Sequence, residues 1–458
     1  EGNRATFDWG INEARSGGLL SDGWVHVAMT VRRETIKLIA RIIVVGVIAF
    51  LSGRGVILSD DNWPQWRGPH RTGVVEGEAW PSTLGEEQLK RRWRVELSEG
   101  YPGPIVSGGR VFTVESGGKR VETVRAFDQK TGEPVWERTW NGSMKVPFFA
   151  AKNGSWVKST PATDGRSLLV GGMQEILVSL DVETGEENWR LDFADRLKSD
   201  RPSFGFVCSP LIDGNFAFLQ AGGGIVKIDI RSGEVVWHVG AGGDGMNDGA
   251  FSSPIVSLVG GEQQLVVQGR KSLKGFNPMN GQLLWEQAVK AFRGMNIVTP
   301  VAFEDSFFTT TYGGRARLWS IGKSVGGFEV ENLWDNKLQG YMCTPVVVDG
   351  FAYFHLRNQR AACVDLKSGE IAWVTDERFG KYWSIVAQGD RLLALDEEGE
   401  LILFRANSKQ FDLIDRRKIA KSETWGHLTA VDGELFVREL DGLSAWDWNE
   451  RSELAVTD

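Results

Sequence analysis

The chain has 458 residues, of which 41% are hydrophobic and 10% aromatic; this is enough apolar surface for a large core and excludes a disordered chain. Its 52 Lys and Arg against 60 Asp and Glu give a net charge of −8, so the basic footprint of a nucleic-acid binder is missing. Three Cys exclude a disulfide-dense scaffold, whereas 19 Trp and 56 Gly indicate many short strands joined by tight turns.

An apolar segment near the N-terminus predicts export. Arg32, Arg33 and Lys37 precede the uncharged residues 42–51, and the apolar run extends back to residue 36 if Lys37 and Arg41 are tolerated. A signal peptide needs about 7–15 apolar residues after a basic stretch, and a membrane-spanning helix needs about 20. We therefore expect residues 29–60 to be a signal peptide. Because no clean cleavage site follows, an uncleaved membrane anchor through residues 36–51 stays open, and residues 1–28 are an upstream segment whose place in the mature protein the sequence leaves open.

Two motifs then recur through the rest of the chain. The motif Asp-x-x-Thr/Ser-Gly-Glu-x-x-Trp is found at residues 128–136, 181–189, 229–237 and 365–373, with a looser copy at 277–285 and room for a degenerate unit ending near Trp334. In phase with it, a small residue and Pro lead into an apolar run and a turn. The six units with this Pro contain Gly103-Pro104, Thr160-Pro161, Ser209-Pro210, Ser253-Pro254, Thr299-Pro300 and Thr344-Pro345, and two units without it begin near Ser384 and Leu428.

The eight units predict a fold. Each unit contains a strand, a tight turn and a second strand, followed by a third strand, a turn in which Gly supplies positive φ, and a fourth strand. Four short antiparallel strands in 40–50 residues form one blade of a β-propeller. We therefore expect residues 61–458 to form an all-β, eight-bladed propeller in which the motif Trp packs against the neighbouring blade. The segment near Trp63–Trp66 is expected to pair with the last blade and close the ring.

At these residues the chain resembles the pyrroloquinoline-quinone-like (PQQ-like) eight-bladed propeller family. The repeated motif resembles that family's tryptophan-docking motif, and Asn62-Trp63-Pro64-Gln65-Trp66-Arg67-Gly68-Pro69 resembles the start of an exported bacterial subgroup. The resemblance covers residues 62–450. One kind of member is a quinoprotein dehydrogenase, which holds PQQ over a Trp floor with Ca²⁺ and a catalytic Asp. The other kind has no cofactor and uses the propeller as a docking surface, as in the propeller lipoprotein of outer-membrane β-barrel assembly, which is similar in repeat pattern.

The chain departs from both kinds. Cys208, Cys343 and Cys363 are never adjacent and no C-x-x-C-H is present, so the vicinal disulfide and attached haem of many quinoproteins are missing. A lipid-bearing Cys beside the apolar segment is missing too. We expect Cys208 and Cys343 to be buried free thiols, while a Cys343–Cys363 pair within one blade stays open.

The segments that resemble catalytic or metal-binding motifs are better explained as structural turns and loops. None of the five His has the sequence spacing of metal ligands, so no metal site is predicted. We expect the acidic loop Asp244–Asp248 to be a solvated loop. Gly322-Lys323-Ser324-Val325-Gly326 matches G-x-S-x-G by letter, but no helix follows, so we expect a hairpin turn.

The candidate binding site is a ring of aromatic residues that precede the inner strands. Such residues surround one mouth of a propeller's channel and can stack on a flat ligand, a sugar or a partner's side chain, or simply pack blade to blade. Lys158, Arg293, Arg357 and Arg360 are nearby cations that could hold an anionic group. The ring consists of Tyr101, Trp156, Phe206, Phe251, Tyr341, Trp383 and Trp425.

These features favour a monomeric, exported, non-catalytic scaffold in the periplasm or another extracytoplasmic place. Its partner would be an envelope protein or a carbohydrate polymer, with no nucleic acid and no predicted cofactor. The alternative is a dehydrogenase of small alcohols or sugars that depends on PQQ with Ca²⁺, for which a carboxylate must lie beside the aromatic floor.

Overall fold

The computed structural model describes residues 62–449, except 78, 119–120, 143, 149–153 and 241–248. The upstream segment 1–28, the expected signal peptide or anchor at 29–60 and the acidic loop Asp244–Asp248 lie outside the described residues. In the part of the chain that is described, no helix is long and apolar enough to cross a membrane.

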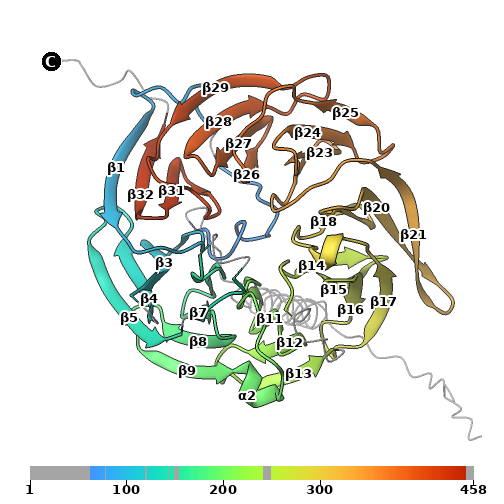
Figure 1. Cartoon of the computed structure of the whole chain (residues 1–458), viewed down its shortest axis with the longest axis horizontal. Helices are drawn as coiled ribbons and strands as arrows, with labels where there is room; N and C mark the ends of the chain where they lie inside the picture. The colour runs from blue at the N-terminus through green and yellow to red at the C-terminus, as the bar shows by residue number, and fades with distance from the viewer. Residues whose placement is uncertain are drawn as a thin grey trace, which may run out of the picture. The chain divides into compact units, whose positions relative to one another are not determined.

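Eight four-stranded antiparallel sheets surround a central axis, which confirms the all-β, eight-bladed propeller (Figure 1). In blades 1 to 7 the strands follow chain order from the axis outward, and in blade 8 the outermost strand is β1, from before the first blade. Blades 1 to 4 contain β2 (Ile105–Ser107), β3 (Arg110–Gly117), β4 (Val121–Asp128), β5 (Pro134–Asn141); β6 (Ala162–Thr163), β7 (Ser167–Gly172), β8 (Ile176–Asp181), β9 (Glu187–Asp192); β10 (Leu211–Asp213), β11 (Phe216–Ala221), β12 (Gly224–Asp229), β13 (Val235–Val239); β14 (Ile255–Val259), β15 (Glu262–Gln268), β16 (Ser272–Phe276) and β17 (Leu283–Ala288).

Blades 5 to 7 contain β18 (Val301–Phe303), β19 (Ser306–Thr310), β20 (Ala316–Ser324), β21 (Gly327–Asn336); β22 (Val346–Val348), β23 (Phe351–His355), β24 (Ala361–Asp365), β25 (Ile371–Val374); β26 (Trp383–Gln388), β27 (Arg391–Asp396), β28 (Glu400–Arg405) and β29 (Asp412–Lys418). Blade 8 contains β30 (Thr429–Val431), β31 (Glu434–Glu439), β32 (Gly442–Trp448) and β1 (Leu89–Glu96). Two short helical turns, α2 (Phe193–Leu197) and η3 (Phe292–Gly294), lie in connections between blades.

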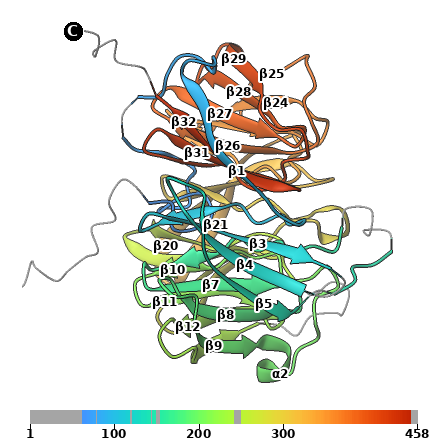
Figure 2. The same cartoon turned by 90° about the vertical axis from the view of Figure 1, so that its left-hand side faces the viewer.

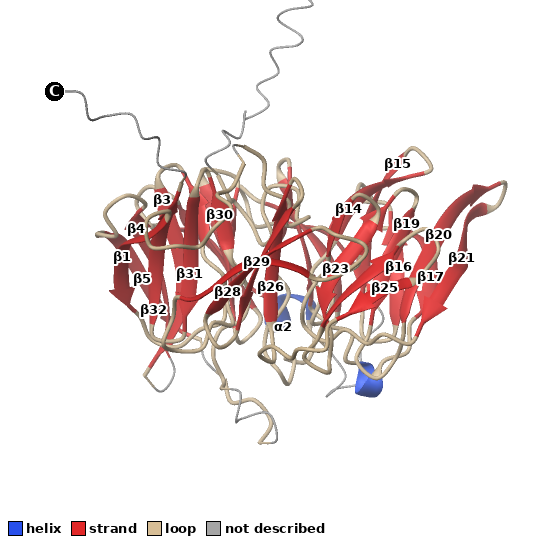
Figure 3. Cartoon of the chain, turned by 90° about the horizontal axis from the view of Figure 1, so that it is seen from above, coloured by secondary structure: helices blue, strands red, loops and turns tan. Residues whose placement is uncertain are grey.

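The propeller has two faces, which Figure 3 shows as loops above and below the strands. We call one the hairpin face, because it carries the turns between the first and second strands of each blade and between the third and fourth strands of blades 1 to 7. We call the other the crossover face, because it carries the connections between blades and the turns between second and third strands. The candidate ring residues belong to the crossover face. The expected hairpin turn in the G-x-S-x-G segment is confirmed, since β20 ends at Ser324 and β21 begins at Gly327 on the hairpin face.

Tryptophan indoles join the outer strands to the following blades, as the repeat motif predicts. In each case the indole N–H donates to a carbonyl of the next blade: Trp136 to Val182 at 3.0 Å, Trp189 to Ile230 at 2.8 Å and Trp373 to Asn407 at 2.7 Å. For Trp136 and Trp189 the ring also rests against the motif glycine of the next blade, Gly185 and Gly233, where a Cβ would lie 2.6 Å from the ring. Trp285 differs, because blade 5 lacks the motif, and its N–H donates to Gln264 of its own blade.

A strand from before the first blade closes the ring, but it is not the strand expected from sequence. The expectation that Trp63–Trp66 pairs with the last blade is wrong, because β1 pairs antiparallel with β32 instead (Figure 2). Pro64, Gly68 and Pro69 interrupt the earlier segment, and proline cannot donate a ladder hydrogen bond.

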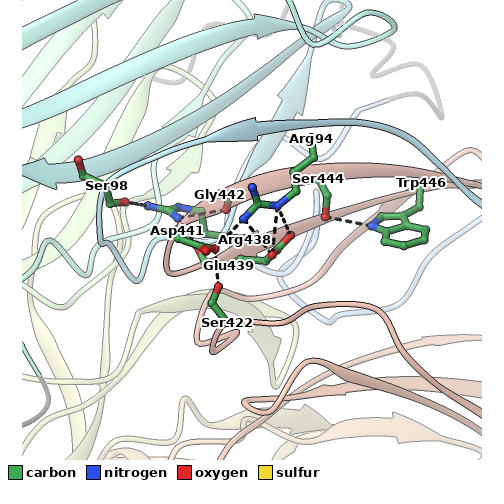
Figure 4. A network of polar contacts seen from close by, with 9 residues as sticks. All are labelled: Arg94, Ser98, Ser422, Arg438, Glu439, Asp441, Gly442, Ser444 and Trp446. Atoms are coloured by element: carbon green, nitrogen blue, oxygen red, sulfur yellow. Dashed lines mark hydrogen bonds and ion pairs between the residues drawn. The ribbon is translucent and has the colours of Figure 1, made fainter.

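Charged side chains fasten this closure (Figure 4). Arg94 of β1 contacts Glu439 at 3.2 Å and Asp441 at 2.6 Å. The buried Arg438 donates to the carbonyl oxygens of Ser98 at 2.5 Å and Gly442 at 3.1 Å. The closure therefore joins chain segments that are more than 300 residues apart.

Hydroxyl groups link the inner strands around the channel. In five of the six units with an inner-strand Pro, the residue before that Pro donates its backbone N–H to the hydroxyl of the equivalent residue in the next blade. We call these residues the hydroxyl girdle. Its five bonds are Gly103 to Thr160, Thr160 to Ser209, Ser209 to Ser253, Ser253 to Thr299 and Thr299 to Thr344, at 3.0–3.2 Å.

The close contact between tryptophan and glycine can be tested with two matched glycines. Gly233 and Gly214 both have positive φ, so an Ala costs each a similar backbone strain of about 1–2 kcal/mol. A Cβ on Gly233 would lie 2.6 Å from the Trp189 ring, whereas a Cβ on Gly214 meets nothing within 4 Å. We expect Gly233→Ala to destabilise the propeller by about 1–3 kcal/mol more than Gly214→Ala, measured by thermal unfolding. Equal losses would contradict the docking contact.

Candidate functional site

The segment of residues 62–75, which we call the plug, runs into the central channel. Trp63 forms an antiparallel bridge with Val106 of blade 1, and Thr163 of blade 2 donates its N–H to Pro64 at 2.8 Å. On its return, the N–H of Val75 donates to Ala387 of blade 7 at 2.8 Å. Figure 1 shows this part of the chain in blue between the inner strands.

The plug enters and leaves at the hairpin face. Gly108, in the first hairpin turn, donates its N–H to Asn62 Oδ1 at 3.1 Å, and Trp80 donates its N–H to Gln388 Oε1 at 2.7 Å beside another such turn. Between these points the chain turns back near the crossover mouth, where Trp66 contacts the His427 ring at 5.9 Å. The plug is therefore a loop inserted into the channel from one side.

Two buried arginines hold the tip of the plug. Arg67 is 1% exposed and donates to the carbonyl oxygens of Thr344 at 2.7 Å and Pro345 at 2.6 Å. Arg71 is 5% exposed and donates to Pro210 at 2.7 Å and Ser209 at 3.2 Å. Both arginines therefore bind carbonyls of the Ser/Thr-Pro pairs that contribute to the hydroxyl girdle.

These cations are solvated by carbonyl dipoles rather than by carboxylates. Among the described residues, neither Arg67 nor Arg71 forms an ion pair with a carboxylate. Burial lowers the pKa of Arg67 to about 10 and that of Arg71 to about 9, which reflects the cost of removing the guanidinium groups from water. Both guanidinium groups also lie against the Trp66 ring, at 5.6 and 5.2 Å from its centroid.

Four aromatic side chains lie side by side at the crossover mouth, and we call them the aromatic arc. Tyr382 stacks on Trp425 at 5.8 Å, Trp425 meets Tyr101 at 5.9 Å, and Tyr101 meets Trp156 at 5.3 Å. All four are partly exposed, and they come from blades 7, 8, 1 and 2. The structure thus brings together three of the predicted ring residues and adds Tyr382, which the sequence analysis missed by one position in favour of Trp383.

The other four predicted ring residues lie elsewhere. Phe206 and Trp383 are 2% and 1% exposed and pack in the core, against Phe193 and Phe379 respectively. Phe251 packs against Phe204 at 5.6 Å, and Tyr341 packs against Tyr312 at 4.9 Å. The crossover mouth is therefore divided into an arc of four rings and two separate aromatic pairs.

Polar groups flank the arc. The ammonium group of Lys158 donates to the carbonyl of Trp156 at 3.0 Å, and burial lowers the pKa of this lysine to about 8. Trp425 donates its indole N–H to Glu423 at 2.6 Å. Burial also raises the pKa of Tyr101 above its usual value, so its hydroxyl is a neutral hydrogen-bonding group. The arc thus offers apolar faces with polar edges.

The remaining predicted cations and thiols do not join the arc. Arg357 lies over the Tyr312 ring at 4.4 Å, and Arg293 lies over Phe292 at 5.2 Å. Arg360 donates to Thr375 and contacts Asp376 at 3.8 Å. The cysteines are all free and buried, which confirms the expectation for Cys208 and Cys343 and gives no Cys343–Cys363 disulfide.

The channel does not fit PQQ and Ca²⁺. The face of Trp66, the tryptophan at the channel axis, lies against two guanidinium groups, and the plug runs between the inner strands, where it is hydrogen-bonded to blades 1, 2, 3, 6 and 7. Carboxylates beside the arc already have partners. Glu423 accepts from Trp425, and Glu397 accepts from the N–H of Tyr382 at 3.3 Å and pairs with Lys381 at 3.3 Å. Within the described residues no group of three or more His, Cys, Asp or Glu could hold a metal ion.

The buried arginine can be tested against an exposed one. Arg67→Gln shortens the side chain and leaves the Thr344 and Pro345 carbonyls without their donor, which we expect to cost about 3 kcal/mol or more. Arg166→Gln, at an exposed hairpin turn, removes the same charge and is expected to cost less than about 0.5 kcal/mol. Thermal unfolding measures both, and equal effects would show that Arg67 does not hold the plug.

Comparisons with known proteins agree with this architecture. The family model described as outer membrane protein assembly factor BamB matches residues 82–149 and 120–375. The BamB of Yersinia pestis is 22% identical over 85% of this chain and 85% of its own length, and that of Shewanella oneidensis is 21% identical over 74% and 82%.

Solved structures with similar folds include both kinds of propeller. BamB from Moraxella catarrhalis has a TM-score of 0.59 and 15% identity, covering 80% of this chain and 99% of that one. The quinohemoprotein alcohol dehydrogenase of Comamonas testosteroni has a TM-score of 0.61 and 12% identity, covering 87% and 82%. At these identities the structures show the fold alone. The match of the family model over most of the propeller shows that the chain belongs to the PQQ-like propeller family of outer membrane protein assembly factor BamB.

Proposed function

We propose that this protein is an exported, non-catalytic scaffold that binds a protein partner at its crossover face, with the aromatic arc at the centre of the contact. The observation that carries the proposal is the combination of a channel occupied by a hydrogen-bonded plug with four partly exposed aromatic rings at its crossover mouth. A ligand cannot enter the channel interior without displacing the plug. A partner would therefore bind to the exposed surface of this mouth and not inside the channel.

Family membership supports a protein partner. The relatives from Yersinia pestis and Shewanella oneidensis are named as outer membrane protein assembly factors. Assembly of outer membrane proteins takes place outside the cytoplasm, and we place this chain in the same compartment. Its partner would then be a protein of outer membrane assembly.

The physical properties of the arc also favour protein binding. Trp and Tyr are enriched among the few residues that dominate the energy of protein interfaces, because they bury a large area at a low entropic cost. Here the rings contact one another and lie above a plug that is hydrogen-bonded to several blades, so little order must be gained on binding. Glu423 and Lys158 supply polar groups at the rim.

Two other uses of the same surface remain as alternatives. A carbohydrate polymer could stack on Trp156 and Trp425, and PQQ could lie on the arc rather than in the channel. The second alternative is the one that the fold of the quinohemoprotein dehydrogenase suggests. Both would use the arc without needing a protein partner.

The test replaces Trp425 and Tyr101 by Ala and compares this variant with Met279→Ala/Val325→Ala, which removes two exposed apolar side chains from the hairpin face. Photoreactive residues at positions 425 and 279 identify what each face touches in cells. We expect position 425 to crosslink an outer membrane assembly protein, and the Trp425/Tyr101 variant to bind that protein at least about thirtyfold more weakly, as loss of interface anchors does.

Thermal unfolding of both variants controls for folding. Equal crosslinking from both positions, or unchanged affinity in the Trp425/Tyr101 variant, would contradict the proposal. Stoichiometric binding of PQQ with Ca²⁺ in a calorimetric titration would favour the dehydrogenase instead. Binding of an envelope polysaccharide that the Trp425/Tyr101 variant abolishes would favour the carbohydrate alternative.

A further inference from the structure

A basic hollow lies on the crossover face where blade 4 leads into blade 5. Its volume is about 480 Å³, and its walls include four cationic residues, Arg270, Lys271, Lys290 and Arg293, together with the apolar Val289 and Ala291. Arg270 and Lys271 come from the turn after β15, and the others come from the connection after β17. The hollow therefore joins two neighbouring loops of one face.

A buried asparagine fixes these two loops together. Asn296 is 0% exposed and donates its amide to the carbonyl oxygens of Gly269 at 3.2 Å, Arg270 at 3.0 Å and Val289 at 3.3 Å. Arg270 in turn donates to the carbonyl of Arg293 at 2.8 Å. Asn296 precedes β18 in blade 5, the unit that contributes none of the seven predicted aromatic ring residues. The hollow therefore lies where the predicted ring is interrupted.

The cations of the connection after β17 are not neutralised by the neighbouring described residues. Within the described part of the chain, Lys290 and Arg293 form no ion pair. A further cation, Arg357, lies nearby through a chain of contacts: it covers Tyr312, and Tyr312 packs against Phe292 at 5.8 Å beside Arg293. Positive charge thus gathers on one side of a protein whose net charge is −8.

We propose that this hollow binds an acidic segment of a protein partner, beside the surface formed by the aromatic arc. The inference rests on the proposed scaffold function and deepens it by naming the chemistry of the partner. Aspartate and glutamate side chains of an extended segment would contact Lys290 and Arg293 first and could extend towards Arg357.

The exposure of the cations favours an extended acidic segment over a single small anion. Lys290 and Arg293 are exposed, so each keeps its water and contributes little alone. A small anion such as a phosphate would need several converging, desolvated donors to be held tightly. A segment with several carboxylates engages the spread charges together, and it is also attracted to them from a distance.

The test uses a fluorescein-labelled peptide of about eight Glu residues and the whole protein, with binding followed by fluorescence anisotropy at low and high salt. We expect binding that weakens with salt, and roughly tenfold weaker binding in Lys290→Gln/Arg293→Gln. Lys367→Gln/Lys409→Gln removes the same charge from exposed residues of the hairpin face and is expected to bind as the unaltered protein does.

Three outcomes would overturn the inference: no binding of the peptide, equal weakening in both double variants, or displacement of the peptide by inorganic pyrophosphate at a lower concentration than by unlabelled peptide. The last outcome would assign the hollow to a small anion. Trp425→Ala/Tyr101→Ala should leave peptide binding unchanged. If the peptide does not bind but the partner still binds through the arc, only this inference is overturned. If the peptide binds as expected but partner binding does not depend on the arc, only the proposed function is overturned.

Discussion

The hydrogen bonds around the channel axis are the constraint on which the rest of the structure depends. Eight inner strands converge there, and each brings backbone groups that must be satisfied away from water. Hydroxyls of the girdle accept the N–H groups from blade to blade. Carbonyls of the same Ser/Thr-Pro pairs still need donors, and Arg67 and Arg71 supply them from the plug. The plug is therefore part of the wall of the channel as well as its filling.

This arrangement decides where binding can occur. A propeller with an open channel can hold a ligand at its axis, but here the axis is occupied by the chain itself. The plug enters from the hairpin face, so its tip forms a floor beneath the crossover mouth, where His427 and Trp66 meet. The aromatic arc and the basic hollow both lie on this crossover face, and they differ in chemistry: one offers flat apolar rings and the other positive charge. A protein partner with an apolar segment and an acidic segment would match both.

Much of the fold could be predicted from the sequence because its determinants are local and repeated. The motif aspartate of each repeat accepts hydrogen bonds from the N–H groups two and three residues later, as in Asp128, Asp181, Asp229 and Asp365. A few consecutive residues therefore determine the turn. The docking of Trp189 onto Gly233 follows from the same motif in two successive blades. These contacts recur with the repeat period, and the sequence shows them several times.

The plug and the arc could not be predicted in the same way, because their partners are distant in sequence. Arg67 binds carbonyls 277 and 278 residues away, and Arg71 binds carbonyls 138 and 139 residues away. The arc was predicted in part. Trp383 begins β26 and points into the core, whereas its neighbour Tyr382 reaches the mouth. Because successive side chains of a strand point to opposite sides, an error of one residue exchanges a mouth residue for a core residue. The sequence signal available for the plug was the presence of Arg67 and Arg71 close to Trp63 and Trp66.

Hydrogen exchange of the plug amides tests the central claim most directly. The N–H groups of Trp63 and Val75 donate to Val106 and Ala387 of the inner strands, both at 2.8 Å. If the plug is a permanent part of the channel, these amides exchange as slowly as those of the inner strands, through opening of the propeller itself. Fast exchange at these two positions, with the inner strands still protected, would show that the plug leaves the channel readily and that the axis is open to a ligand.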